Sequence, residues 1–269
     1  MRELLAAATE RLRAAGVASP EHDARVLAAH VLGIPLKQLP LHDTLDHDAY
    51  DALVARRAQR VPLQHLTGSV GFRWIELQVG PGVFVPRPET ESVVQWAIDH
   101  APKDPLVVDL CAGSGAIALS IAHEVPGATV HAVELDPVAA GWTRRNAEGI
   151  GVVVHEGSID GCLPELDGTV DLVISNPPYV PYSDRARMEP EVLDHDPDLA
   201  LFADDEGLAV IRVVEQTARR LLKPGGLVVV EHADSQGESA SAVFAEWAEV
   251  ADHVDLTGRP RFVTARWTA

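Results

Sequence analysis

Hydrophobic residues at the start of the chain recur with the spacing of an amphipathic helix. The apolar positions on this face are Leu4, Leu5, Ala8 and Leu12. A second helix is predicted to begin at Pro20, with Ser19 as its N-cap, and to end at Gly33. A third is expected over residues 48–60, so the pattern predicts a small helical domain in the first part of the chain.

Beyond residue 105 the pattern changes to short apolar runs separated by stretches of helical spacing. The runs are residues 106–110, 129–135, 151–155, 170–175 and 226–231. Strands that alternate with helices form a parallel sheet with helices on both faces, and such strands are apolar throughout because both faces are buried. The predicted fold class is therefore α/β, with a mostly parallel sheet.

Glycines and prolines separate the two patterns. Residues 75–79 alternate apolar with polar side chains, a Gly-Pro-Gly turn occupies residues 80–82, and Val83-Phe84-Val85 follows. This arrangement predicts a β-hairpin between residues 75–79 and 83–85. We therefore divide the chain into a helical domain over 1–68, a hairpin linker over 69–86 and a larger domain over 87–269.

The distribution of charge supports this division and limits the possible partners. The 269 residues include 22 Lys and Arg against 40 Asp and Glu, a net charge of −18. Residues 1–70 hold eight acids and eight bases, so the excess negative charge belongs entirely to the later part. A surface that binds nucleic acid must neutralise many phosphates with Lys and Arg, so direct nucleic-acid binding is not expected.

Three arginines, Arg56, Arg57 and Arg60, fall close together at the end of the third predicted helix. The simplest interpretation is a solvent-exposed face, where positive charge interacts favourably with the carboxyl end of the helix dipole. The alternative interpretation is a docking surface for a protein partner.

The remaining composition indicates a cytoplasmic protein. Two cysteines, Cys111 and Cys162, provide no disulfide framework and favour a reducing compartment. The first residues are too polar for a signal peptide, and no run approaches the roughly 18 apolar residues of a membrane span. The twelve histidines show no metal-ligand spacing. We expect a monomer that uses neither a membrane nor a metal ion.

The first apolar run of the larger domain ends in a glycine-rich turn over Asp109-Leu110-Cys111-Ala112-Gly113-Ser114-Gly115, and a helix is expected from Ala116. Glycines let the backbone turn sharply and approach a ligand at the carboxyl end of a strand. The second run ends in Glu134-Leu135-Asp136, where the Glu134 carboxylate can accept hydrogen bonds from ribose hydroxyls. Asp136 is assigned instead to an N-cap. These features predict a nucleotide-like cofactor and leave hydride and methyl-transfer cofactors equally possible.

The fourth run is followed by Asn176-Pro177-Pro178-Tyr179. An Asn side chain offers one acceptor oxygen, and a residue before proline favours extended backbone, which directs the Asn side chain and the Pro177 carbonyl toward one place. Two acceptors can hold both hydrogens of a planar –NH2 group, and Tyr179 can stack on its flat face. The pattern therefore predicts a site for an amide or amino nitrogen.

Taken together, the glycine-rich turn, Glu134 and Asn176-Pro177-Pro178-Tyr179 resemble class I S-adenosylmethionine-dependent methyltransferases. The four-residue signature is shared by N6-adenine and protein glutamine methyltransferases. Two further stretches, residues 82–91 and 255–262, are similar to those of the peptide chain release factor glutamine methyltransferases, and the similarity covers essentially the whole chain. It implies a Rossmann-like sheet with an antiparallel C-terminal hairpin and a helical domain that recognises the substrate.

The resemblance also implies an activity and a set of site residues. The methyl group of S-adenosylmethionine would go to the side-chain amide nitrogen of the glutamine in the Gly-Gly-Gln motif of class I release factors. Asn176, Pro177 and Tyr179 would be catalytic, and Asn176, Pro177, Pro178 and Tyr179 would hold the glutamine. The cofactor-binding residues would be Asp109, Cys111, Ala112, Gly113, Ser114, Gly115, Glu134, Asp160, Gly161 and Asn176.

The sequence departs from the family pattern at three places. Cys111 replaces the usual first glycine of the turn, Gly161 stands where an aromatic residue often follows the acid, and Glu231-His232-Ala233 replaces Glu-Ile-Gly. No base is patterned beside Cys111, so we expect its thiol to be buried against the cofactor rather than to act as a nucleophile.

Three alternative functions share part of this pattern. A ribosomal-protein glutamine methyltransferase has the same chemistry, and an N6-adenine methyltransferase shares Asn176 to Tyr179 but needs a basic surface. A nonenzymatic binding module needs only the cofactor residues. The acidic segment over residues 180–205 is predicted to be a long loop, with His195 in solvent, and we expect this loop to act as a lid over the substrate.

Overall fold

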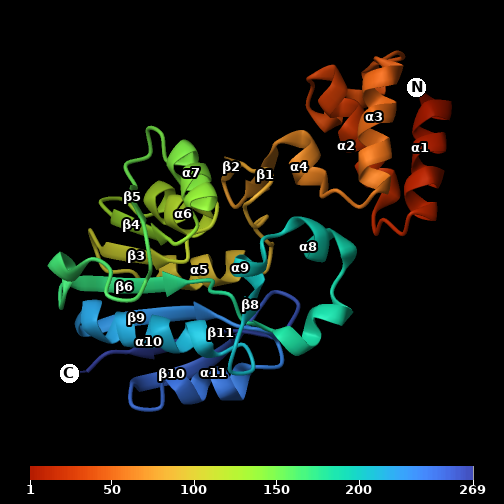
Figure 1. Cartoon of the computed structure of the whole chain (residues 1–269). Helices are drawn as coiled ribbons and strands as arrows, with labels where there is room; N and C mark the ends of the chain where they lie inside the picture. The colour runs from red at the N-terminus through yellow and green to blue at the C-terminus, as the bar shows by residue number, and fades with distance from the viewer. Residues whose placement is uncertain (269) are drawn as a thin grey trace. The chain divides into compact units, whose positions relative to one another are not determined.

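The computed structural model describes residues 1–268, and these residues form two compact units (Figure 1). The helical unit contains residues 1–69 and also residues 189–195. The larger unit, called the α/β unit below, contains residues 70–188 and 196–268 of the described chain. No helix among the described residues is long and apolar enough to cross a membrane.

The helical unit is built around a small apolar core. Its elements are α1 (Arg2–Ala14), α2 (Pro20–Leu32), η1 (Leu36–Leu41), α3 (His47–Ala58), α4 (Leu63–Thr67) and α8 (Pro190–His195). The three helices expected from the sequence are confirmed, and α2 ends where Gly33 takes the left-handed conformation that favours glycine. Leu12 and Leu27 are fully buried, and the buried Tyr50 hydroxyl donates to the Ala24 carbonyl at 3.0 Å.

The prediction of an exposed arginine face at the end of α3 is wrong for two of the three residues. Arg56 is exposed, but Arg57 is buried and Arg60 is largely covered. Their guanidinium groups bind Asp23 and the carboxylates of Glu189 and Glu191. Asp23 lies in α2, and Glu189 and Glu191 lie more than a hundred residues later in the chain, so the sequence of α3 by itself could not reveal these partners.

The α/β unit contains a seven-stranded sheet in the order β10-β11-β9-β6-β3-β4-β5. The strands are β3 (Leu106–Leu110), β4 (Thr129–Glu134), β5 (Val153–Glu156), β6 (Val170–Ser175), β9 (Leu222–Glu231), β10 (Ala248–Val254) and β11 (Pro260–Arg266). The strands from β9 to β5 run parallel, and β11 pairs antiparallel with both β9 and β10. The predicted fold class, a mostly parallel sheet with an antiparallel C-terminal hairpin, is confirmed.

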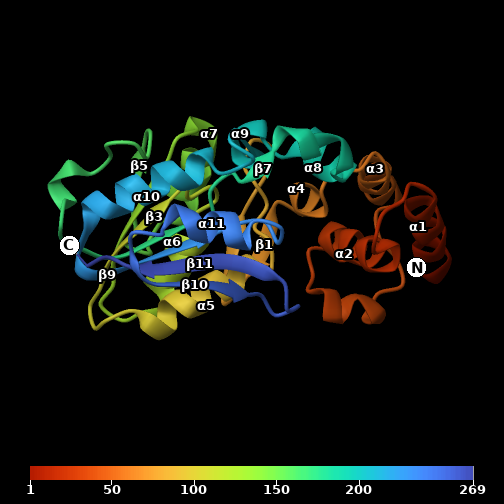
Figure 2. The same ribbon diagram turned by 90° about the horizontal axis from the view of Figure 1, so that it is seen from below.

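Helices cover both faces of this sheet (Figures 1 and 2). They are α5 (Thr90–His100), α6 (Ala116–Glu124), α7 (Pro137–Asn146), α10 (Ala209–Leu221) and α11 (Gly237–Val243). Along β3, Val107 joins the core with α5 and α6, whereas Val108 and Leu110 join the core with α10 and α11. This alternation follows from the two-residue period of a strand and explains why the whole run is apolar.

The hairpin is present, but the predicted pairing is wrong. Strand β1 (Ser69–Phe72) pairs with β2 (Ile75–Gln78), whereas residues 83–85 form no strand. Arg73 adopts a φ of 49° at the turn, and its Nε binds Glu124 at 2.6 Å, which fixes the chain reversal there. Val83 instead packs with Val79 and Ala139 in a small buried cluster.

The segment over residues 180–205 contains short elements instead of the predicted open loop. They are β7 (Val180–Pro181), η3 (Tyr182–Arg187), α8, α9 (Asp198–Leu201) and β8 (Phe202–Ala203), and β7 pairs with β8. The expectation of a solvated stretch around His195 is wrong for the neighbouring Asp196, which is buried. Its carboxylate binds Arg87 Nη2 at 2.6 Å.

Candidate functional site

A cavity of about 340 Å³ lies at the carboxyl ends of the parallel strands in the α/β unit. The chain turns after β3, β4, β5 and β6 all contribute to its lining, and β3 lies where the strand order reverses direction. Open α/β sheets bind ligands at such a switch point, because the loops on either side of it diverge and leave a crevice. The fold therefore places the cavity where the sequence predicted a cofactor.

Most of the predicted site residues line this cavity. Those in the lining are Cys111, Ala112, Gly113, Ser114, Glu134, Asp160, Asn176, Pro177, Pro178 and Tyr179. Asp109, Gly115 and Gly161 lie outside the lining. The lining also includes Leu135, Ser158 and Ile159, which sequence reasoning missed. Their only sequence signal is their position directly after a strand or beside a predicted site residue.

Asp109 lies behind the cavity rather than in it. Its side chain is fully buried, and Oδ2 accepts a hydrogen bond from the Ala118 backbone N–H at 3.0 Å, at the start of α6. Burial raises the pKa of this carboxyl well above its usual value, since the backbone hydrogen bond offsets only part of the desolvation. Asp109 thus fixes the first turn of α6 against β3, and any effect on a ligand passes through the backbone.

The glycine-rich turn is held by hydrogen bonds from α7. Thr143 Oγ1 donates to the Gly113 carbonyl at 2.7 Å, and Asn146 Nδ2 donates to the Ser114 carbonyl at 3.0 Å. Gly113 adopts a φ of 59°, and a Cβ there would have no neighbour within 4 Å. Because Gly113 lines the cavity, a side chain at this position would stand in space that a ligand could use.

Glu134 presents a fixed carboxylate to the cavity. Its Oε2 accepts from the Gly113 N–H at 2.8 Å, and its Oε1 accepts from the Asp136 N–H at 2.9 Å. Burial raises the pKa of Glu134 above its usual value, although the surrounding backbone N–H groups lower it in part. Each carboxylate oxygen keeps a lone pair, so the side chain can accept hydrogen bonds from two neighbouring hydroxyls. Asp136 caps α7 through Val138 and Ala139, as expected.

The Cys111 thiol is unsuited to nucleophilic chemistry. Burial is the main influence that raises its pKa, and the nearby carboxylates of Glu134 and Asp109 raise it further. The thiolate is the reactive form of cysteine, and this environment disfavours it at neutral pH. Cys111 also has a φ of 66°, so it occupies the left-handed conformation at the position where the family pattern has glycine.

The Asn176 amide has a fixed orientation. Its Nδ2 donates to Thr90 Oγ1 at 3.2 Å, and within residues 1–268 no hydrogen-bond donor contacts Oδ1. At the preceding position, Ser175 Oγ donates to the Leu110 carbonyl at 2.6 Å and ties the end of β6 to β3. The structure therefore leaves the Asn176 acceptor oxygen available at the cavity, beside the buried Pro177.

Tyr179 is held from behind by Glu231, at the carboxyl end of β9. The Tyr179 hydroxyl donates to Glu231 Oε1 at 3.1 Å, and the Tyr179 carbonyl accepts from Gln236 Nε2 at 3.0 Å. Burial raises the pKa of Glu231 to about 7, while Thr90, Arg261 and Tyr179 limit the rise. The same carboxylate thus interacts with Tyr179 and with Thr90, the residue that orients Asn176.

No group of three or more His, Cys, Asp or Glu side chains in the described chain is arranged to hold a metal ion. What the cavity offers is two separate sets of polar groups. One set, around Gly113 and Glu134, suits a ligand with hydroxyl groups. The other, around Asn176 and Tyr179, suits a planar group with N–H donors.

Comparison with known proteins relates this chain to methyltransferases. Residues 3–68 match the family described as PrmC N-terminal domain, and residues 80–192 match the methyltransferase small domain. A relative from Streptomyces coelicolor, a release factor glutamine methyltransferase, is 56% identical over 97% of this chain and 96% of its own length. A Streptomyces pristinaespiralis relative, 4-amino-L-phenylalanine/4-methylamino-L-phenylalanine methyltransferase, is 42% identical over 88% of this chain and 84% of its own length.

A solved structure supports the fold independently of close sequence similarity. A methyltransferase from Pyrococcus furiosus is 18% identical, covers 72% of this chain and 89% of its own, and superposes with a TM-score of 0.53.

Proposed function

This chain belongs to the release factor glutamine methyltransferase family, and we propose that Asn176 to Tyr179 hold the glutamine of a release-factor Gly-Gly-Gln motif for N5 methylation. S-adenosyl-L-methionine is the methyl donor. The observation that carries the site assignment is the fixed amide of Asn176, whose Oδ1 is left for a substrate N–H while Nδ2 is bound to Thr90.

The residues around the glycine-rich turn fit S-adenosylmethionine. Glu134 provides two anchored acceptor oxygens for the ribose hydroxyls, and the open space beside Gly113 allows close approach of the ligand to the backbone. Leu135 and Ile159 add apolar surface, and Asp160 adds an acceptor, on the part of the cavity suited to an adenine ring. We assign the ribose to Glu134 and the adenine to these three residues.

The mechanism rests on how the chain holds the substrate nitrogen. An amide nitrogen is a poor nucleophile because its lone pair is delocalised into the carbonyl group. If Asn176 Oδ1 and the Pro177 carbonyl each accept one N–H, they favour the rehybridised nitrogen and direct its lone pair, so their hydrogen bonds are strongest in the transition state. When bound, S-adenosylmethionine would supply the methyl group from its sulfonium, whose sulfur leaves as a neutral thioether, and the methylated nitrogen would then lose one proton to solvent. Tyr179, whose hydroxyl donates to Glu231, would stack on the flat face of the substrate carboxamide and hold it in place.

Two other substrates use the same nitrogen chemistry. The Streptomyces pristinaespiralis relative is named for an aromatic amine, and N6-adenine methyltransferases act on another planar nitrogen. The match of residues 3–68 to the PrmC N-terminal domain favours a release factor over both, and the net charge of −18 opposes a nucleic acid. We further propose a monomer that acts in the cytoplasm.

The direct test is mass spectrometry of a class I release factor incubated with the protein and S-adenosylmethionine. We expect an added mass of about 14 Da, confined to the peptide that contains the Gly-Gly-Gln glutamine. A glutamine-to-asparagine variant of the factor is the matched control and should stay unmodified. Methylation of 4-amino-L-phenylalanine, ribosomal protein or adenine in preference to the factor would contradict the proposal.

A further inference from the structure

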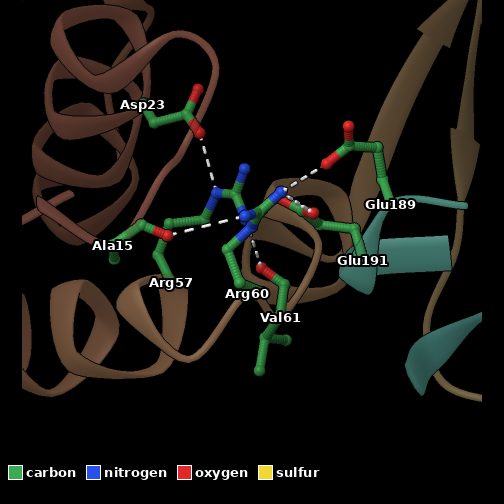
Figure 3. Close-up of polar contacts among 7 residues, drawn as sticks. All are labelled: Ala15, Asp23, Arg57, Arg60, Val61, Glu189 and Glu191. Carbon is green, nitrogen blue, oxygen red and sulfur yellow. Dashed lines mark hydrogen bonds and ion pairs between the residues drawn. The ribbon is translucent and has the colours of Figure 1, made fainter. Parts of the chain in front are cut away.

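The chain between the substrate signature and α10 belongs to both compact units in turn. Residues 180–188 are part of the α/β unit, residues 189–195 are part of the helical unit, and Asp196 is again part of the α/β unit. Figure 3 shows what fastens the middle portion to the helical unit. Arg57 and Arg60, at the end of α3, bind Glu189 and Glu191, and we call these four residues the arginine clip.

Glu191 is the centre of the clip. Its Oε1 accepts from Arg57 Nη1 at 3.1 Å and from Arg60 Nε at 2.6 Å, and its Oε2 accepts from Arg60 Nη2. Arg60 Nη2 also reaches Glu189 Oε2 at 3.0 Å. The burial of the Glu191 carboxyl tends to raise its pKa, but hydrogen bonds from Arg60 and Arg57 bring the pKa below its usual value.

The clip differs from an ordinary surface ion pair. The side chains of Arg57, Arg60 and Glu191 are only 8%, 18% and 19% exposed. Arg57 is further held by Asp23, whose Oδ2 lies 2.7 Å from Arg57 Nε and whose side chain is also buried. Exposed pairs contribute little because water competes for both charges, whereas loss of one partner from a buried network leaves an uncompensated charge.

The residues that follow the clip form one wall of the cavity. Pro197, Leu199, Ala200, Leu201 and Phe202 all line it. At Asp196 the wall is anchored within the α/β unit by the buried ion pair with Arg87, and at its far end β8 pairs with β7. Asp196 alone separates this wall from residues 189–195, which belong to the helical unit.

We propose that Glu191, Arg57 and Arg60 are positioning residues that couple the helical unit to the cavity wall over residues 197–202. The part of this inference that concerns turnover rests on the proposed function, because it assumes that a release factor binds the helical unit. A bound factor then steadies the wall against which its own glutamine must fit, whereas a short Gly-Gly-Gln peptide gains nothing from the clip.

The test compares Glu191→Gln with wild type on two substrates, an intact release factor and a short peptide that contains Gly-Gly-Gln. For Glu191→Gln, kcat/KM should fall about tenfold on the intact factor, a typical magnitude for coupling between sites, and stay within about twofold on the peptide. Glu191→Asp, which keeps the charge, should recover part of the loss. Asp184→Asn is the matched control, because it breaks an exposed pair with Arg187 in the same segment, outside residues 197–202.

Amide hydrogen exchange gives a readout that does not depend on the substrate. In Glu191→Gln, residues 197–202 should exchange about tenfold faster than in wild type, while α1 and α3 keep their protection, which shows that the helical unit remains folded. Faster exchange confined to residues 189–195, or an equal loss of kcat/KM on factor and peptide, would overturn the coupling. If wild type methylates neither substrate, the proposed function fails and the exchange of residues 197–202 alone decides the inference.

Discussion

Asn176 is the residue on which the proposed chemistry depends most. Replacement by Ala removes the acceptor for one substrate N–H but leaves the groups around Glu134 intact. We expect Asn176→Ala to lower kcat by about a hundredfold or more, as is usual when a transition-state hydrogen bond is lost. Affinity for S-adenosylmethionine should change little. A radiolabelled methyl-transfer assay and isothermal titration together measure the two effects.

Thr90→Val serves as the control for the orientation of the Asn176 amide. This variant keeps the Asn176 acceptor but removes the hydroxyl that holds Nδ2, so its loss of turnover should be smaller than that of Asn176→Ala. Equal turnover in Asn176→Ala and wild type would remove Asn176 from the mechanism.

The raised pKa of Glu231 predicts that the stability of the folded protein depends on pH. Its pKa in the folded protein is about 7, above the ordinary value of 4.5. A carboxyl with a raised pKa favours the folded state fully only below its ordinary pKa, and this contribution is lost as pH rises from 4.5 through 7. The stability of Glu231→Gln relative to wild type should therefore increase over this window, by on the order of 3 kcal/mol. Urea unfolding at pH 5, 6 and 8 measures it, and a pH-independent difference would contradict it.

Sequence reasoning could identify some of these residues and not others. Glu134 is the last residue of β4 and Asn176 directly follows β6, and carboxyl ends of parallel strands meet at one edge of a sheet, so their proximity was predictable. Thr90 lies in a helix far from Asn176 in the chain, and Glu231 contributes through contacts behind the site. Such supporting contacts form only in the packed structure, so the spacing of residues along the sequence does not reveal them.

At the scale of elements, the position of Tyr179 depends on the turn before α10. Gly207 adopts a φ of 84°, and a Cβ there would lie 2.0 Å from the Tyr179 carbonyl oxygen and 2.5 Å from Gln236 Nε2. Gly207→Ala should therefore displace the backbone of Tyr179 as well as strain its own conformation. We expect a loss of about 1–3 kcal/mol in the free energy of unfolding, together with reduced turnover.

Gly168→Ala separates these two effects. Gly168 has a similar φ of 68°, but a Cβ there would meet nothing within 4 Å. This variant should suffer the conformational strain alone and retain wild-type turnover. Thermal unfolding and methyl transfer measured on both variants make the comparison, and full activity in Gly207→Ala would show that the Tyr179 backbone tolerates displacement.

The sequence predicted best those helices and strands whose pattern of apolar and polar residues follows directly from burial. Each apolar run of the parallel sheet became a strand, and the central strands β3 and β6 are mostly apolar because both of their faces are covered. The alternation over residues 75–79 indicated a strand but could not select its partner, and the Arg73 turn decided the pairing with β1. Arg57 and Arg60 had the same ambiguity, since their carboxylate partners lie in α2 and in the segment around α8.

At the scale of the whole molecule, the two units have separate apolar cores, and the proposed cofactor contacts belong to the α/β unit alone. A ligand that binds only the folded form stabilises the unit to which it binds, by about 2.7 kcal/mol at a concentration of 100 times Kd. Saturating S-adenosylmethionine should therefore slow amide exchange in β3, β4 and β6 by about a hundredfold, wherever exchange requires unfolding of the sheet. Exchange in α1, α2 and α3 should change by much less.

Glu134→Ala is the control for this final prediction, because it removes the anchored carboxylate without touching the helical unit. At the same ligand concentration, this variant should show little of the protection seen in wild type. Equal protection of α1, α2 and α3 in wild type would mean that the two units unfold as one. The comparison of wild type with Glu134→Ala therefore determines whether a ligand bound in the α/β unit stabilises that unit alone.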